Sequence, residues 1–164
     1  MMKLFIDGDG CNAHARALAL RLTSRNIFVE IVSNVSISTA SDRIETSHYT
    51  ATVVSADSDA VDDYIVEHIA EGDALITRDL VFAKRALAKG AWVVSDYGEQ
   101  YFLETIDARM VSSHARANIR MTETANTASK KNAQKKAKQL RERTQKLVAF
   151  FDAWIVHRKN SQKD

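Results

Sequence analysis

The sequence contains no proline, a single cysteine and no long hydrophobic run. Without proline, no proline-rich linker divides the chain into separate domains. A single cysteine excludes an internal disulfide, which fits a protein of a reducing compartment. No apolar stretch approaches the roughly 18 residues of a transmembrane helix, and the N-terminus lacks the apolar segment of a signal peptide. We therefore expect a cytoplasmic protein that does not associate with membranes.

Charge is distributed unevenly along the 164 residues. Residues 1–110 carry 10 basic and 17 acidic side chains, a balance of −7, whereas residues 111–164 carry 13 basic and 4 acidic ones, a balance of +9. A basic C-terminal segment beside an acidic body is suited to holding a polyanion. The alternative is that these charges only form the solvated face of a helix, and the sequence leaves both interpretations open.

Strand-like and helical patterns alternate along the first 110 residues. Short runs rich in apolar and β-branched residues predict strands at 3–7, 27–32, 51–54, 74–77 and 91–95. Apolar residues at helical spacing predict helices at 11–25, from 57–59 to Gly72, at 80–89 and at 100–110. This alternation predicts an α/β fold with a mainly parallel sheet of about five strands and helices on both faces.

The rest of the chain divides into a connector and a C-terminal helix. Residues 111–128 show no clear periodicity and are interpreted as a connector. A long helix is predicted for 129–164, because apolar residues from Ala133 to Trp154 recur mainly at helical spacing. Its apolar second half is expected to pack on the body or on a partner, which includes a second copy of the chain. The predicted organisation is a domain of residues 1–110, a connector of 111–128 and a helix of 129–164.

Acidic residues follow the apolar strands of the predicted sheet. Asp7 ends the first strand and Asp79 follows the fourth, so both are expected at the C-terminal edge, where open α/β sheets bind ligands. Further acidic residues are expected on the same side: Asp9, Asp59, Asp62 and Asp96. Grouped carboxylates repel unless a proton or a cation intervenes, and Mg²⁺ and Mn²⁺ favour oxygen ligands. The pattern predicts a divalent-metal site, in which the Thr77 hydroxyl could bond a carboxylate or a phosphate oxygen.

Two other interpretations of these residues stay open. Each aspartate taken alone could cap a helix or form a turn, because Asp is common at such positions. Alternatively, Asp7 and Asp9 resemble the nucleophile and the general acid of haloacid-dehalogenase-type phosphatases. Cys11 stands where that motif has Thr or Val, and Lys84 follows the second acidic motif too closely to be its phosphate-binding lysine. The phosphatase hypothesis is therefore the weaker alternative to a metal site.

Three segments match the motifs of one family, in the same order: Asp7-Gly8-Asp9-Gly10-Cys11-Asn12, Asp59 with Asp62 to Val66, and Gly72 to Asp79. They resemble the YaiI/YqxD family of uncharacterised bacterial proteins, also called UPF0178 or DUF188. Gly98-Glu99-Gln100-Tyr101 matches a later motif of that family. The resemblance covers about residues 3–120. This chain departs from the family at Asn12, where the family has Pro, and at Gly8 and Gly10, where it has Ala.

The resemblance implies a PIN-like domain, since the family looks like a branch of these metal-dependent nucleases. The residues that it implies for catalysis and metal binding are Asp7, Asp62 and Asp79, with Asp9 and Asp96 as further metal ligands and Asp59 and Thr77 supporting them. The leading hypothesis is a Mg²⁺- or Mn²⁺-dependent nuclease that acts on RNA. The basic residues expected to bind phosphates are Lys130, Lys131, Lys135, Lys136, Lys138, Arg141 and Arg143.

A rival hypothesis is a non-catalytic nucleic-acid-binding or assembly module in which the acidic pocket is vestigial. It predicts salt-sensitive RNA binding through the basic helix and no rise in melting temperature when metal is added. The phosphatase alternative predicts turnover of p-nitrophenyl phosphate through an aspartyl-phosphate at Asp7. A metal-dependent nuclease predicts neither turnover of p-nitrophenyl phosphate nor an aspartyl-phosphate.

Overall fold

The computed structural model describes residues 1–36, 47–120 and 130–161, and of residues 114–120 and 130–132 the backbone alone. Its centre is a six-stranded sheet in the order β3-β2-β1-β4-β5-β6. The strands are β1 (Lys3–Asp7), β2 (Phe28–Ser33), β3 (Tyr49–Val53), β4 (Ala74–Ile76), β5 (Trp92–Val94) and β6 (Gln100–Tyr101). The helices are α1 (Ala13–Leu20), the short 3₁₀ helix η1 (Arg21–Arg25), α2 (Ala60–His68), α3 (Leu80–Ala88), α4 (Ile106–Arg120) and α5 (Lys130–Asn160).

β1 lies inside the sheet and is apolar on both faces. It pairs in parallel with β2 and β4, and the pairs β2–β3 and β4–β5 are parallel as well. Leu4, Phe5 and Ile6 are fully buried, as expected for a parallel strand that helices cover on both sides. β6, at the edge, runs antiparallel to β5. The α/β fold with a mainly parallel sheet that the sequence predicts is confirmed.

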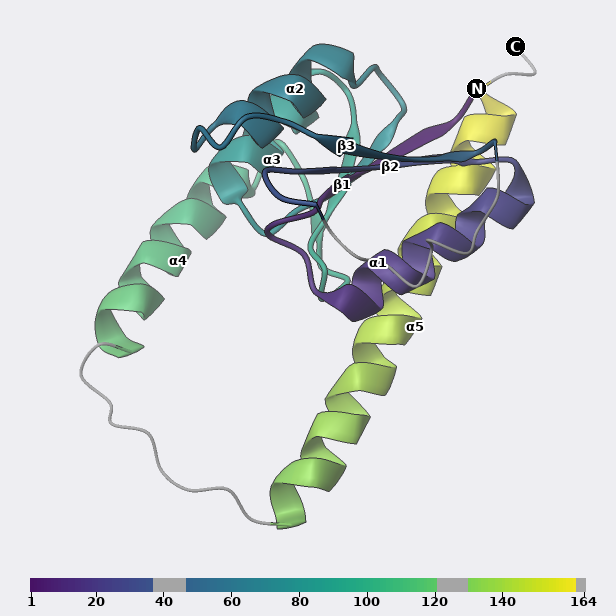
Figure 1. The fold of residues 1–164 in the computed structure, drawn as a ribbon. Helices are drawn as coiled ribbons and strands as arrows, with labels where there is room; N and C mark the ends of the chain where they lie inside the picture. Colours follow the sequence, from purple (N-terminus) through teal and green to yellow (C-terminus); the bar gives the residue numbers. More distant parts are fainter. Residues whose placement is uncertain (37–46, 121–129, 162–164) are drawn as a thin grey trace.

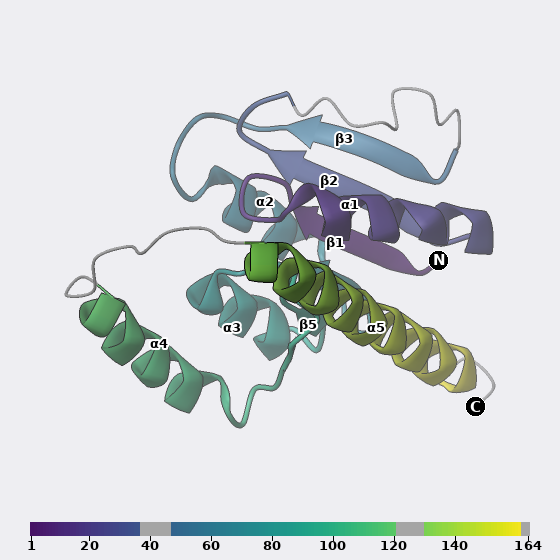
Figure 2. The ribbon, with the colours of Figure 1, turned by 90° about the horizontal axis from the view of Figure 1, so that it is seen from below.

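Helices enclose the sheet from both sides (Figure 1). α1 and α5 lie on one face, where Leu4 and Ile6 pack in one apolar cluster with Trp154. α2 and α3 lie on the other face, where Phe5 belongs to a second cluster with Phe82. Successive residues of β1 thus serve opposite layers, because side chains alternate along a strand. The three layers, also visible in Figure 2, are consistent with the predicted PIN-like architecture.

α5 packs its C-terminal half on the body of the protein. Leu147, Phe150, Phe151 and Trp154 are buried, and the indole Nε1 of Trp154 donates a hydrogen bond to the Gly72 carbonyl oxygen at 2.8 Å. Each such side chain contributes roughly 1.5–3 kcal/mol when it leaves water. The sequence left open whether this half packs on the body or on a partner, and the structure shows it on the body, while a homo-oligomer through the helix stays a prediction. Although α5 is 31 residues long, none of the described helices has the length and apolar composition needed to span a membrane.

Residues 100–110 form two elements rather than the single predicted helix. Gln100 and Tyr101 form β6 and pair with β5, and the helix begins only at Ile106. The chain reaches β6 through a turn at Gly98, whose φ of +84° suits glycine. A Cβ at Gly98 would lie 2.5 Å from the Cβ of Lys146, so α5 also rests directly on this turn.

α4 extends beyond its predicted end. It runs to Arg120, so residues 111–120 of the predicted connector are helical, and residues 121–128 lie outside the described part of the chain. Burial of Ile106 fixes the start of the helix, and Lys84 Nζ of α3 pairs with Asp107 Oδ1 at 2.7 Å. Contacts with α3 therefore hold the first turn of a helix whose own periodicity is weak.

Candidate functional site

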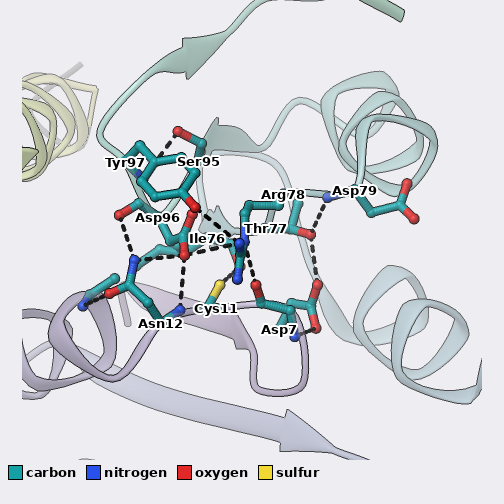
Figure 3. Close-up of polar contacts among 12 residues, drawn as sticks. Asp7, Cys11, Asn12, Ile76, Thr77, Arg78, Asp79, Ser95, Asp96 and Tyr97 are labelled. Atoms are coloured by element: carbon teal, nitrogen blue, oxygen red, sulfur yellow. Dashed lines mark hydrogen bonds and ion pairs between the residues drawn. The ribbon is translucent and has the colours of Figure 1, made fainter. Parts of the chain in front are cut away.

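The C-terminal ends of β1, β4 and β5 meet at one edge of the sheet, because these strands are parallel neighbours. β1 ends in Asp7, Thr77 follows β4 directly, and Asp96 comes two residues after β5. Figure 3 shows these side chains with their polar contacts. These three residues are among those that the sequence predicts for this edge. The surroundings of the two carboxylates differ.

Asp7 is buried, with 8% of its surface exposed. The Thr77 hydroxyl donates to its Oδ2 at 2.8 Å, and the Gly10 backbone N–H donates to its Oδ1 at 3.0 Å. Burial raises the pKa of Asp7, the charges of Asp9 and Asp79 raise it further, and the two hydrogen bonds oppose the shift. Neutral groups therefore donate both hydrogen bonds to this carboxylate, and the charges that raise its pKa belong to other carboxylates.

Thr77 connects Asp7 to the start of α3. Its side chain is fully buried, and its oxygen accepts the Asp79 backbone N–H at 3.1 Å. Asp79 Oδ1 in turn accepts the backbone N–H groups of Val81 at 2.8 Å and Phe82 at 3.0 Å, which confirms the helix-capping interpretation. One oxygen performs the capping, so Asp79 can serve as cap and as ligand at the same time.

Asp62 adds a carboxylate from the first turn of α2. Its side chain is half-buried, and its pKa is raised from 3.8 to about 7. Burial is the largest cause, followed by the charges of Asp79 and Asp7, while Arg85 opposes them. The charges of Asp79 and Asp7 thus act on Asp62 from the edge of the sheet. Metal binding by these three aspartates stays a prediction.

Asp59 and Asp9 lie at the border of this group. Asp59 occupies the N-cap position of α2 without a side-chain hydrogen bond to the helix, and its charge also raises the pKa of Asp62. Asp9 is exposed, and its Oδ2 accepts the Asn34 backbone N–H at 2.7 Å. This contact ties Asp9 to the residue that follows β2.

Asp96 has a different environment, and only 1% of its surface is exposed. Its Oδ2 accepts the backbone N–H of Asn12 at 2.9 Å and the side-chain amide of Asn12 at 2.7 Å. The same oxygen pairs with Arg78 Nε at 3.3 Å. In the view of Figure 3, Cys11 lies between Asp96 and Asp7. Asp96 thus anchors the loop after β1, and its role as a further metal ligand stays a prediction.

Asn12 and Arg78 support the site but were not among the residues predicted for it. Asn12 Oδ1 accepts the Ala15 backbone N–H at 2.9 Å and so caps α1, while its amide holds Asp96. Arg78 Nε donates to the Gly10 carbonyl oxygen at 2.6 Å. The available signal for Arg78 was its place between Thr77 and Asp79 in the matched motif.

Cys11 lies beneath the loop as a structural residue. It is buried, and its thiol donates to the Ile76 carbonyl oxygen at 3.3 Å. Burial raises the pKa of Cys11 well above its ordinary value, and the charges of Asp7 and Asp96 add to that shift. A thiol with these neighbours stays protonated and is a poor nucleophile.

The acidic group suits Mg²⁺ or Mn²⁺ by the chemistry of its donors but is not a complete ligand set. Across residues 1–36, 47–120 and 130–161, no three His, Cys, Asp or Glu side chains are placed to hold a metal ion by themselves. Mg²⁺ usually takes one or two carboxylates and completes its shell with water and phosphate oxygens. Two of the carboxylates of Asp7, Asp62 and Asp79 would therefore suffice when solvent and substrate supply the rest.

The basic residues predicted to bind phosphates belong to the N-terminal half of α5. The side chains of Lys130 and Lys131 lie outside the described part of the chain. Those that are exposed are Lys135, Lys136, Lys138 and Arg141. Arg143 is half-buried, with its guanidinium carbon 4.2 Å from the centroid of the Tyr97 ring. Arg143 therefore ties α5 to the β5–β6 turn, and the exposed members present positive charge to solvent.

These features define an α/β domain with an acidic sheet edge and a basic C-terminal helix. The family described as "Uncharacterized BCR, YaiI/YqxD family" matches residues 5–150, and the chain belongs to it. A UPF0178 protein of Citrifermentans bemidjiense is 32% identical over 120 residues, which cover 73% of this chain and 75% of that protein. A UPF0178 protein of Sulfurimonas denitrificans is 29% identical over 149 residues, which cover 90% and 96% of the two chains. No solved structure matches the chain.

Proposed function

We propose that this protein is a Mg²⁺- or Mn²⁺-dependent nuclease that cleaves RNA. The observation that supports it most directly is that Asp7 and Asp79 follow the neighbouring parallel strands β1 and β4, while their charges raise the pKa of Asp62 at the start of α2. Carboxylate oxygens at a sheet edge suit a hard divalent cation. Such an ion would polarise a phosphodiester and lower the pKa of a bound water.

Each of the three aspartates has a distinct part in this proposal. Asp7, fixed by Thr77 and Gly10, and Asp79, fixed by its cap on α3, would hold the ion. Asp62, which is half-buried beside them, would complete the ligand set or orient the attacking water. Thr77 would keep Asp7 and the start of α3 in register, because it bonds to both.

α5 supports RNA as the substrate. Its exposed lysines can bind phosphates without reading a base sequence. The contact of Arg143 with Tyr97 places this helix against the turn that follows β5, close to Asp96 and the acidic edge. An RNA strand bound along α5 would therefore pass near the carboxylates of the acidic edge.

The direct test is cleavage of single-stranded RNA with Mn²⁺ by the wild type and by Asp7→Asn, purified identically. We expect a loss of at least about 100-fold, as is typical when one catalytic electrostatic group is removed. Asp152→Asn is the matched control, because Asp152 is an exposed carboxylate that pairs with Arg25 at the surface. Equal activity of Asp7→Asn and the wild type would assign the cleavage to a contaminant and end the proposal.

A non-catalytic RNA-binding module is the second candidate, since no three described side chains hold a metal unaided. Melting in the presence of Mn²⁺ separates the two. An ion that binds only the folded state stabilises it by about 2.7 kcal/mol at a hundredfold excess over Kd. The nuclease proposal predicts a rise in Tm for the wild type and none for Asp79→Asn, in which Asn still caps α3. Salt-sensitive RNA binding without any rise in wild-type Tm would favour the second candidate.

A further inference from the structure

A cavity of about 710 Å³ opens beside the acidic edge, between the β5–β6 turn and α4. Arginine, tyrosine and serine side chains dominate its lining, among them Arg78, Tyr97, Arg109 and Ser112. Its volume lies within the range of sites that take small organic ligands. The cavity is thus large enough for a nucleotide, and its lining is rich in hydrogen-bond donors and includes one carboxylate, that of Glu99.

Arg78 presents part of its guanidinium to this cavity. Its Nε donates to Gly10 and pairs with Asp96, and its Nη1 donates to the Tyr97 hydroxyl oxygen at 3.1 Å. Among the described residues no acceptor lies on Nη2, and 45% of the side chain is exposed. Because the Tyr97 oxygen already accepts a hydrogen bond, its own hydrogen remains to be donated. Figure 3 shows Arg78 and Tyr97 side by side at the acidic edge.

Arg109 presents a second guanidinium from α4. Its Nη2 pairs with Glu99 Oε2, and its guanidinium carbon lies 5.0 Å from the centroid of the Tyr101 ring. Among the described residues its Nε and Nη1 have no acceptor, and 40% of the side chain is exposed. Two arginine forks and a phenol hydroxyl that line one cavity match the oxygens of a phosphate.

The cavity adjoins the predicted metal ligands. Arg78, which lines the cavity, pairs with Asp96 at 3.3 Å. It also donates to the carbonyl oxygen of Gly10, whose N–H donates to Asp7. A phosphate bound by Arg78 would thus lie next to the carboxylates, while an attached base and sugar would occupy the rest of the volume.

We propose that this cavity binds one nucleotide of a single-stranded RNA, with its phosphate between Arg78 and Arg109 and the Tyr97 hydroxyl. The assignment of RNA rests on the proposed function, because the cavity would hold the nucleotide adjacent to the phosphodiester at the carboxylates. The chemistry that is recognised is a nucleotide phosphate, which a free mononucleotide also offers.

The test is binding of a fluorescent hexauridylate in EDTA, followed by anisotropy, so that neither metal nor cleavage is required. We expect about tenfold weaker binding for Arg109→Gln and a smaller loss for Tyr97→Phe, which removes only the hydroxyl. Arg25→Gln is the matched control, since Arg25 is also an exposed arginine in an ion pair but lies away from the cavity. Melting curves of all variants verify that they are folded.

Competition with small ligands shows whether the phosphate is recognised and whether it belongs to RNA or to a free mononucleotide. Uridine monophosphate should displace the probe and uridine should not. Equal binding by Arg109→Gln, Tyr97→Phe and Arg25→Gln would overturn the proposal. Tighter binding of uridine monophosphate than of the hexamer would overturn the assignment of RNA.

The outcome for the cavity is separable from that for the nuclease. Binding that depends on Arg109 in a protein that cleaves nothing would support the cavity and reject only the proposed function. If Asp7→Asn abolishes cleavage while Arg109→Gln leaves RNA binding and KM unchanged, the nuclease proposal is supported and nucleotide binding in the cavity is overturned.

Discussion

Asp7 and Asp96 are both buried at the same edge of the sheet, yet their surroundings are opposite. Asp96 pairs with the guanidinium of Arg78 and accepts two further donors. Asp7 accepts hydrogen bonds from neutral groups and lies among other carboxylates, whose charges raise its pKa. The protein itself thus supplies a cation to Asp96, whose Oδ1 is nevertheless buried without a hydrogen-bond partner among the described residues, whereas the charges that act on Asp7 are those of other carboxylates.

The comparison indicates which buried carboxylates are candidates for ligand binding. A buried carboxylate with a cationic partner has a structural use, and removal of either partner leaves the other uncompensated. Carboxylates grouped without such compensation favour protonation or an added cation. Charge compensation, rather than burial or position at a strand end, is therefore the property by which Asp7 and Asp96 differ at this edge.

The largest expected effect is that of Asp96→Ala on folding. The change removes the anionic partner of Arg78 and the acceptor of two Asn12 N–H donors, and we expect a loss of about 2–3 kcal/mol in the free energy of unfolding. Urea denaturation at neutral pH measures it. Asp7→Asn should lose far less, since burial and neighbouring charges already disfavour the ionised form of Asp7.

Asp152→Ala controls for the loss of an ordinary ion pair. Its pairing with Arg25 is exposed, and such pairs contribute about 0–1 kcal/mol. If Asp96→Ala is no less stable than Asp152→Ala, or if Asp7→Asn loses as much as Asp96→Ala, the two carboxylates do not differ as we infer.

The elements that the sequence predicts best are those whose signal is local. β1 covers Lys3–Asp7, as predicted, because a strand buried on both faces is a continuous apolar run. The same run places Asp7 at the edge. β6 escaped prediction, because two residues are too few to show a strand period, and their pairing with β5 depends on the turn at Gly98.

In the candidate site, too, the sequence predicts what depends on local signals and misses what depends on contacts between distant residues. Strand-end position predicted that Asp7 and Asp79 share an edge, which a parallel sheet brings about. The same rule grouped Asp96 with them, and it could not reveal that Arg78 compensates Asp96, since that pairing depends on side-chain directions at two strand ends. Position along the chain thus predicts which residues meet at an edge, whereas the ion pairs that compensate their charges can be identified only in the structure.

A smaller effect, dependent on pH, is expected for Asp62→Asn. The folded-state pKa of about 7 lies above the ordinary 3.8, so the favourable contribution of Asp62 is fully present below about pH 4 and is lost as pH rises through 7. Asn carries no charge, so relative to the wild type the variant should gain stability between pH 5 and pH 8. The gain is on the order of 1 kcal/mol once screening by solvent is allowed for.

Melting temperatures of wild type and variant at pH 5 and pH 8 measure this gain. The control is Asp63→Asn, at the neighbouring position, where the carboxylate is exposed and pairs with Arg85 at 2.7 Å. A difference between Asp62→Asn and wild type that is the same at both pH values would show that Asp62 does not feel the charges of Asp7 and Asp79.

The smallest effect on stability is expected for Gly10→Ala, which alters the geometry of Asp7 and not its charge. A Cβ at Gly10 would lie 2.5 Å from Asp7 Oδ2, so the carboxylate must move and its bond with Thr77 must weaken. The end of a side chain can shift at little cost, and we expect less than about 1 kcal/mol of lost stability. The rise in Tm with Mn²⁺ should nevertheless shrink, because a displaced carboxylate is a poorer ligand. An unchanged Mn²⁺ response would mean that the position of Asp7 fixed by Gly10 and Thr77 is not the one that binds metal.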